Sequence, residues 1–103
     1  MTKVFISQPM KDKTNQEIEQ ERKEIIEKIR KYFEKIEVKV IDSFIKDAPH
    51  GAKPLWFLGK SLELLSNADA IVLGKDWERS RGCRIEHECA VQYGIPIIYI
   101  ENL

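Results

Sequence analysis

Short apolar runs alternate with longer amphipathic stretches along the whole of this chain of 103 residues. The apolar runs have the length and the β-branched content of buried strands, whereas the stretches between them repeat apolar residues at helical spacing. The expected strands cover residues 4–6, 37–41, 69–74 and 96–100, and the expected helices follow Thr14, Pro54 and Arg84. Because parallel strands need a crossover between them, this alternation predicts a parallel α/β sheet in a single domain, residues 1–103.

The handedness of the crossovers predicts the order of the strands. Right-handed connections place helices on both faces of the sheet, which gives a three-layer Rossmann-like or flavodoxin-like sandwich. For four strands we expect the order 2-1-3-4, with its switch point between the first and third strands. The second strand, residues 37–41, would lie at an edge, in keeping with its greater polar alternation. The loops that begin at Ser7 and Lys75 would then face each other across a ligand crevice.

Local signals mark the ends of the helices. Thr14 and Glu17 have the spacing of a capping box at the start of the first helix. Pro54 suits the first turn of the second helix, and Gly94 suits the end of the third. The first helix repeats apolar residues at helical spacing, namely Ile18, Ile25, Ile26, Ile29, Phe33 and Ile36.

Charge and cysteine content narrow the classes of function. The chain carries 17 basic and 17 acidic residues, so it lacks the positive excess typical of nucleic-acid-binding domains. No run is long enough to cross a bilayer and no signal peptide is evident, so we expect a cytoplasmic protein without a membrane partner. Cys83 and Cys89 lie on opposite sides of the third helix, and with His50 and His87 they lack the spacing of a zinc site. We therefore expect no disulfide, no metal and no cofactor, and we interpret His87 as a surface imidazole.

The stretch Asp76–Glu86 joins the third strand to the third helix and concentrates the reactive side chains. Ligands bind at such turns in open parallel sheets, although this turn lacks both the P-loop and the dinucleotide-binding glycine patterns. An ionised Glu86 in the first turn of its helix could act as a nucleophile, with Asp76 as a second carboxylate. Free amides at the helix start and nearby polar groups would hold an anion, and these residues are Arg79, Ser80, Arg81, Gly82 and Cys83.

The loop after the first strand supplies the opposite wall of the predicted crevice. Its candidate ligand contacts are Ser7, Gln8, Pro9 and Met10, with Asp42, Ser43 and His50 nearby in the long loop 42–53. Asp69 starts the third strand, at the end of the sheet away from the crevice, so we interpret it as structural. Spacing alone leaves open whether these residues catalyse a reaction or only bind a ligand.

The chain resembles the nucleoside 2-deoxyribosyltransferase superfamily, in particular its small members described only as deoxyribosyltransferase-like domains. The resemblance covers nearly the whole chain and rests on residues 4–10, 68–73, 82–86, 90 and 93–98. In that superfamily a glycine followed four residues later by glutamate marks the nucleophile, and an alanine four residues further on belongs to the same helix. Gly82, Glu86 and Ala90 match this pattern.

The resemblance implies cleavage or transfer at an N-glycosidic bond. Glu86 would attack the anomeric carbon, Asp76 would protonate the departing base, and water or a second base would resolve the ester. Ser80 stands where the transferases carry an aspartate, and it resembles the nucleotide N-glycosidases, in which a hydroxyl helps to hold a 5′-phosphate. We therefore expect a nucleoside 5′-monophosphate as ligand, and a homo-oligomer that uses the surface around Trp56 and Phe57. The alternative is a non-catalytic nucleotide-binding or interaction module on the same fold.

Overall fold

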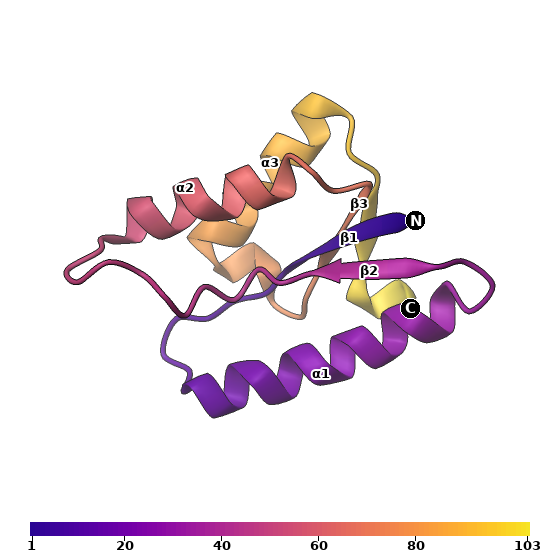
Figure 1. The fold of residues 1–103 in the computed structure, drawn as a ribbon, viewed down its shortest axis with the longest axis horizontal. Coiled ribbons are helices and arrows are strands. Elements are labelled where there is room, and N and C mark those ends of the chain that lie inside the picture. The colour runs from indigo at the N-terminus through magenta and orange to yellow at the C-terminus, as the bar shows by residue number, and fades with distance from the viewer.

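The computed structural model describes residues 1–103 and confirms the predicted three-layer α/β fold (Figure 1). The sheet contains β1 (Thr2–Ser7), β2 (Val38–Ile41), β3 (Ala70–Leu73) and β4 (Ile97–Tyr99). Its order is β2-β1-β3-β4, and every neighbouring pair is parallel. Helix α1 (Asn15–Tyr32) covers one face, and α2 (Pro54–Leu65) and α3 (Arg81–Tyr93) cover the other (Figure 1). Two short 3-10 helices, η1 (Trp77–Arg79) and η2 (Ile100–Asn102), follow β3 and β4.

Alternation along β1 divides the core into two layers. Val4 and Ile6 pack against α1, whereas Phe5 packs in the layer that contains Ala90 of α3. Successive side chains of a strand point to opposite faces, so Ser7 at the end of β1 shares the face of Phe5. This register directs the Ser7 hydroxyl toward α3.

The starts of α1 and α3 both carry side-chain caps. Thr14 accepts from the Glu17 amide at 3.1 Å while the Glu17 carboxylate accepts from the Thr14 amide at 3.0 Å, which confirms the capping box. Helix α3 begins at Arg81 rather than at the expected Arg84, because the Ser80 hydroxyl caps it by accepting from the amide three residues later. Glu86 consequently lies in the second turn of α3 and not in the first.

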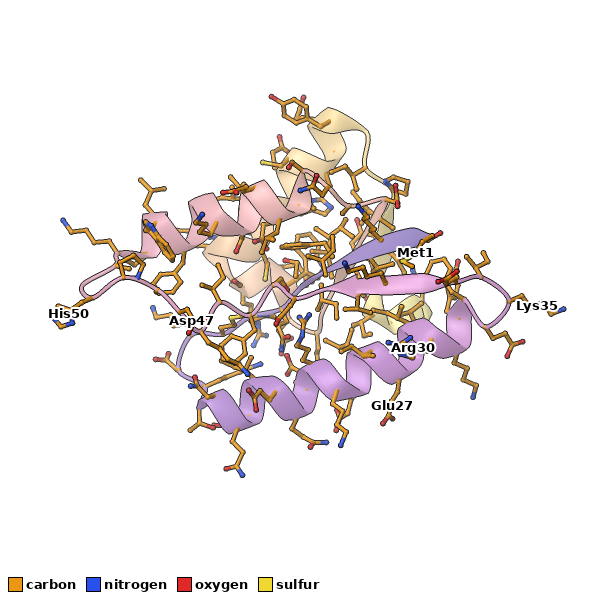
Figure 2. The ribbon with its side chains drawn as sticks, in the orientation of Figure 1. Met1, Glu27, Arg30, Lys35, Asp47 and His50 are labelled. Atoms are coloured by element: carbon orange, nitrogen blue, oxygen red, sulfur yellow. The ribbon has the colours of Figure 1, made fainter.

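Charged side chains cover the exposed surface of α1, and Glu27 and Arg30 are both exposed (Figure 2). The helix ends at Tyr32, so Ile36, expected in its apolar stripe, lies beyond it and is 55% exposed. No helix combines the length and the apolarity that crossing a membrane requires.

Asp69 has a structural role at the start of β3. Its carboxylate accepts from the Lys3 amide at 2.8 Å, and its amide donates to the Lys3 carbonyl at 2.7 Å. These bonds agree with our interpretation of Asp69 as a structural residue.

His87 is not the surface imidazole that we expected, because its ring stacks on Trp77 with centroids 4.4 Å apart. Its Nε2 also lies 3.0 Å from the Tyr99 hydroxyl. His87 is therefore part of an aromatic cluster between η1, α3 and β4.

Candidate active site

A cavity of about 820 Å³ lies at the carboxyl ends of β1 and β2. Its walls come from the loop after β1, the loop 42–53, the first half of α2 and the first turns of α3. We call it the Glu86 cavity, after the one acidic residue among those that line it. Ligand pockets of small molecules commonly have volumes of about 300–1,000 Å³, so the Glu86 cavity has the size of a ligand site.

A short hydrogen bond fixes the Glu86 carboxylate inside this cavity. The Ser7 hydroxyl donates to Glu86 Oε1 at 2.6 Å, and the two side chains are 1% and 7% exposed. Burial raises the pKa of Glu86, and the hydroxyl groups of Ser7 and, to a smaller degree, Ser61 act in the opposite direction. Ser7 binds only one of the two carboxylate oxygens. The bond therefore orients the carboxylate and leaves Oε2 outside this contact.

Basic residues dominate the charged part of the lining. Four basic residues line the cavity together with Glu86, and they are Lys11, Lys13, Lys53 and Arg81. Lys13 also forms an ion pair with Glu21 at 3.0 Å. The cavity is therefore positively charged in a chain whose formal net charge is +0, which favours an anionic ligand.

Apolar side chains form a second part of the lining. Phe44 and Ile45 come from the loop 42–53, and Phe57 and Leu58 come from α2. Sites for organic ligands typically combine such apolar surface with a few fixed polar groups. A ligand with one anionic end and one flat apolar end matches both parts of this lining.

The start of α3 adds backbone donors to the cavity. The Ser80 hydroxyl accepts from the Cys83 amide at 3.3 Å, whereas the amides of Arg81 and Gly82 have no acceptor within the helix. A Cβ at Gly82 would meet nothing within 4 Å, so the backbone there is open to an approaching group. Burial raises the pKa of the Cys83 thiol, which lies between this turn and Glu86. Free amides at a helix N-terminus are suited to bind an anion.

Most of the residues predicted for the site do line the Glu86 cavity. The structure brings together Ser7, Gln8, Met10, Ser80, Arg81, Gly82, Cys83 and Glu86. Pro9 and Arg79 do not line it, although each is adjacent in sequence to residues that do. Arg79 is exposed at the end of η1.

Asp76, expected to protonate a departing base, does not lie in the Glu86 cavity. It is exposed and lines a separate hollow of about 500 Å³ with Glu21, Lys28 and Trp77, which we call the Asp76 hollow. The backbone of Asp76 is left-handed, with φ of 62°, and the next residue, Trp77, packs onto His87. This turn carries Asp76 away from the Glu86 cavity.

The loop 42–53 contributes only some of its polar residues. Ser43 lines the cavity and is fixed by Arg22, which donates to its hydroxyl at 3.0 Å, and by its own donation to the Ile6 carbonyl at 2.8 Å. Asp42 lies outside, 3.9 Å from the Arg22 guanidinium, and His50 lies at the outer tip of the loop (Figure 2).

Several lining residues were not selected from the sequence. They are Lys11, Lys13, Asn15, Phe44, Ile45, Lys53, Phe57, Leu58 and Ser61. Lys11 and Lys13 follow β1 directly, so the predicted edge of the sheet was a usable signal for them. The residues of α2 carried no such signal, because periodicity does not tell which end of an apolar helix face meets a ligand.

The comparisons with known proteins place the chain in a family without assigning it an activity. No curated protein matches the chain. The crystal structure of a conserved protein from Enterococcus faecalis V583 is similar, with a TM-score of 0.69, 19% identity and 96% of this chain covered. This chain spans 62% of the length of that protein, and the likeness shows the fold alone. Residues 2–99 match the family model of a domain of unknown function, DUF4406, and the chain belongs to that family.

Proposed function

We propose that this protein cleaves the N-glycosidic bond of nucleoside 5′-monophosphates, or transfers their sugar, through a covalent intermediate on Glu86. The observation that carries the proposal is the buried Glu86 carboxylate, held by a 2.6 Å hydrogen bond from Ser7 within a positively charged cavity. The resemblance to the nucleoside 2-deoxyribosyltransferase superfamily supports the same residue as the nucleophile.

The same carboxylate takes part in both steps of the proposed reaction, as the nucleophile and then as the leaving group. Glu86 attacks C1′ as the base departs, and the resulting glycosyl ester is then opened by water or by a second base, as in retaining glycosidases. Burial removes water from the carboxylate, which makes its ionised form more reactive, while the Ser7 hydroxyl keeps one oxygen in place. The second oxygen is the one that we expect to form the bond to C1′.

The lining of the cavity favours a nucleotide over a free nucleoside. A phosphate would meet Arg81, the lysines and the amides at the start of α3, which together match its charge and its acceptor oxygens. A base would lie against the rings of Phe44 and Phe57. A nucleoside would leave Lys11, Lys53 and Arg81 without a counter-ion.

Base release from a panel of nucleoside 5′-monophosphates and the matching nucleosides tests this proposal. We expect the monophosphates to be cleaved faster, and Glu86→Gln to abolish release. The matched control is Glu88→Gln, which changes an exposed carboxylate on the same helix and should leave release unchanged. Adding a second free base separates the two reactions, because transfer yields a new nucleotide and hydrolysis does not. Release that persists in Glu86→Gln would refute the assignment.

A non-catalytic module is the second candidate function, and the surface of α2 favours it. Leu65 is the one residue of α2 that is buried, and Leu55 is 76% exposed although the helix is apolar on several sides. An apolar helix exposed in this way suits a contact with another copy of the chain. We propose a homo-oligomer through α2, which sedimentation of the wild type and of Leu55→Lys would test. Nucleotide binding without base release would favour the module.

A cytoplasmic location completes the proposal. Cys83 and Cys89 are both free thiols, and Cys83 is buried beside the candidate nucleophile. Free thiols persist most readily in reducing compartments. Localisation of the tagged full chain would test this expectation.

A further inference from the structure

The Glu86 cavity contains a nucleophile but no matching acid, and this inference rests on the proposed function. Glu86 is the one residue with a carboxyl group among those that line the cavity, and no histidine lines it. A purine or pyrimidine that leaves as an anion is a poor leaving group, so glycosidases normally protonate the departing group with a second carboxyl group. The structure thus supplies half of the usual catalytic pair.

The other protonated groups in the cavity are too weakly acidic for this task. Lysine and arginine side chains are far weaker acids than a carboxyl group or an imidazole, so they are poorly suited to donate a proton at neutral pH. Burial raises the pKa of Cys83 further above its ordinary value. The candidate outside the cavity, Asp76, lines the Asp76 hollow, and His87 is committed to Trp77 and Tyr99.

We infer that the substrate carries a base that is already a cation, as in a pyridinium nucleotide or an N7-alkylated purine nucleotide. Glu86 Oε attacks C1′, the C1′–N bond breaks, and its electron pair neutralises the ring nitrogen, so the base departs uncharged without receiving a proton. Water then attacks C1′ of the ester, the C1′–Oε bond breaks to regenerate the carboxylate, and one proton is released to solvent. The sum is a cationic nucleotide plus water giving a sugar phosphate, a neutral base and a proton.

The lining suits such a substrate at both ends. The face of an aromatic ring attracts a flat cation, and Phe44 and Phe57 both line the cavity. One cation already lies near the Phe44 ring from outside the cavity, because the Lys46 ammonium is 5.4 Å from its ring centroid and Lys46 does not line the cavity. The ionised Glu86 is the only anionic group of the cavity and would lie beside the positive ring, while the basic residues face the phosphate.

The test compares substrates that differ only in the charge of the base. Guanosine 5′-monophosphate and its N7-methyl derivative form the matched pair, and nicotinamide mononucleotide is an independent pyridinium probe. Base release is measured with the wild type and with Glu86→Gln, whose rate corrects for spontaneous hydrolysis. General acid catalysis typically contributes about 10²–10⁴ in rate, so we expect the methylated nucleotide to react at least about a hundredfold faster than its parent.

Each outcome separates this inference from the proposed function. Equal Glu86-dependent rates for the matched pair would overturn the inference, because an enzyme with a working acid gains nothing from a base that cannot accept a proton, yet the proposed function would stand. Release from neither nucleotide nor from nicotinamide mononucleotide would overturn the proposed function. The pH profile of the parent nucleotide gives a second readout, because a general acid acts only while it is protonated. A Glu86-dependent rate with guanosine 5′-monophosphate that falls toward about pH 9 would reveal a working general acid and contradict the inference.

Discussion

Two hollows of opposite charge lie side by side where the strands of this sheet end. The Glu86 cavity has four basic residues and one acidic residue in its lining. The Asp76 hollow reverses this balance, with two basic residues, Lys28 and Lys75, against five acidic ones, Glu21, Glu24, Asp76, Glu78 and Glu101. The stretch 76–86 contributes to both hollows, so two residues ten positions apart in sequence belong to environments with opposite preferences for a ligand.

A hydrogen-bonded wall separates the two hollows. Gln8 lines the Glu86 cavity, and its amide nitrogen donates to the Ile18 carbonyl at 3.3 Å and to the Glu21 carboxylate at 3.2 Å. Glu21 lines the Asp76 hollow and accepts from Lys13, which lines the Glu86 cavity, at 3.0 Å. Gly74 completes the contact, because a Cβ there would lie in tight contact with Gln8 and Ser7. The wall gives Glu86 and Asp76 different environments although they are only ten positions apart in sequence.

The largest expected effect tests whether catalysis is confined to one side of this wall. Glu86→Gln removes the nucleophile and should lower the rate of base release by at least about a thousandfold. Asp76→Asn changes a carboxylate of the other hollow and should alter the rate by less than about threefold, whereas loss of a true general acid costs about 10²–10⁴. Steady-state base release measures both. A hundredfold loss in Asp76→Asn would show that the two hollows cooperate.

The next largest effect should be on stability, and it concerns the aromatic cluster of Trp77, His87 and Tyr99. Trp77 stacks on His87, and its ring centroid lies 5.8 Å from that of Tyr99. It also packs against the apolar layer of α2 and α3. Trp77→Ala should lower the free energy of unfolding by about 2–3 kcal/mol, less than the roughly 3–5 kcal/mol lost when a core Phe or Trp is truncated, because the ring is half-buried. Urea unfolding followed by circular dichroism measures the change.

Trp56 offers a matched control for that substitution. It is also half-buried, but it belongs to neither apolar layer, and the ring that it meets is its neighbour Phe57. Trp56→Ala should therefore cost less than about 1 kcal/mol. Equal losses for the two tryptophans would mean that Trp77 does not define the turn between the hollows.

The sequence was sufficient to predict the sheet and the meeting of Ser7 with Glu86. Strand order follows from short-range pattern and crossover handedness, and these two residues, 79 positions apart, lie on neighbouring sides of the predicted switch point. The start of α3 was misplaced by one turn because Ser80 was read as a ligand contact and not as an N-cap. Because of that error we expected Glu86 in the first turn of α3, where the helix dipole would favour its ionised form. In the structure it lies in the second turn, and burial raises its pKa.

The position of Asp76 could not be predicted from spacing. Its direction depends on a left-handed residue followed by a tryptophan that packs onto a helix, and both are consequences of tertiary contacts. The basic lining was missed for a related reason, since Lys11, Lys13 and Lys53 look like any solvated lysines until the loops that carry them converge. Charge at a site is thus a property of the fold, even when the composition is balanced.

A smaller effect should follow from disturbing the wall itself. A Cβ at Gly74 would lie 3.3 Å from the Gln8 Cβ and 3.4 Å from the Ser7 carbonyl oxygen, a tight contact, so Gly74→Ala requires a small adjustment of Gln8. We expect a loss of about 1 kcal/mol, the low end for overpacking, and a melting temperature lower by about 4–8 °C. Gly59→Ala is the control, because its Cβ would meet nothing and alanine favours the interior of α2 by up to about 1 kcal/mol. Calorimetry should show a lower melting temperature for Gly74→Ala and a higher one for Gly59→Ala. An unchanged melting temperature in Gly74→Ala would mean that Gln8 accommodates the added methyl group without loss of stability.

The smallest expected effect concerns the pH dependence of stability. Burial raises the pKa of Glu86, against the opposing hydroxyls of Ser7 and Ser61, above the value of about 4.3 for an unfolded chain. The fold therefore favours the protonated carboxyl, whose contribution to stability is complete below the unfolded pKa and is lost as pH rises through the folded pKa. Glutamine does not ionise, so Glu86→Gln should gain stability relative to the wild type as pH rises from about 4 toward neutrality.

Glu17 supplies a control of opposite sign. The backbone amide and the hydroxyl of Thr14 lower the pKa of this exposed carboxylate, so its contribution is present above the unfolded pKa and is lost as pH falls through the folded pKa. Glu17→Gln should therefore be most costly near neutral pH and least costly in acid, whereas Glu86→Gln should be most favourable near neutral pH. Urea unfolding at a series of pH values would measure both differences. If the two variants followed pH in the same direction, Glu86 would not experience the desolvation that distinguishes its cavity from an exposed helix end, and its assignment as a buried nucleophile would lose its electrostatic basis.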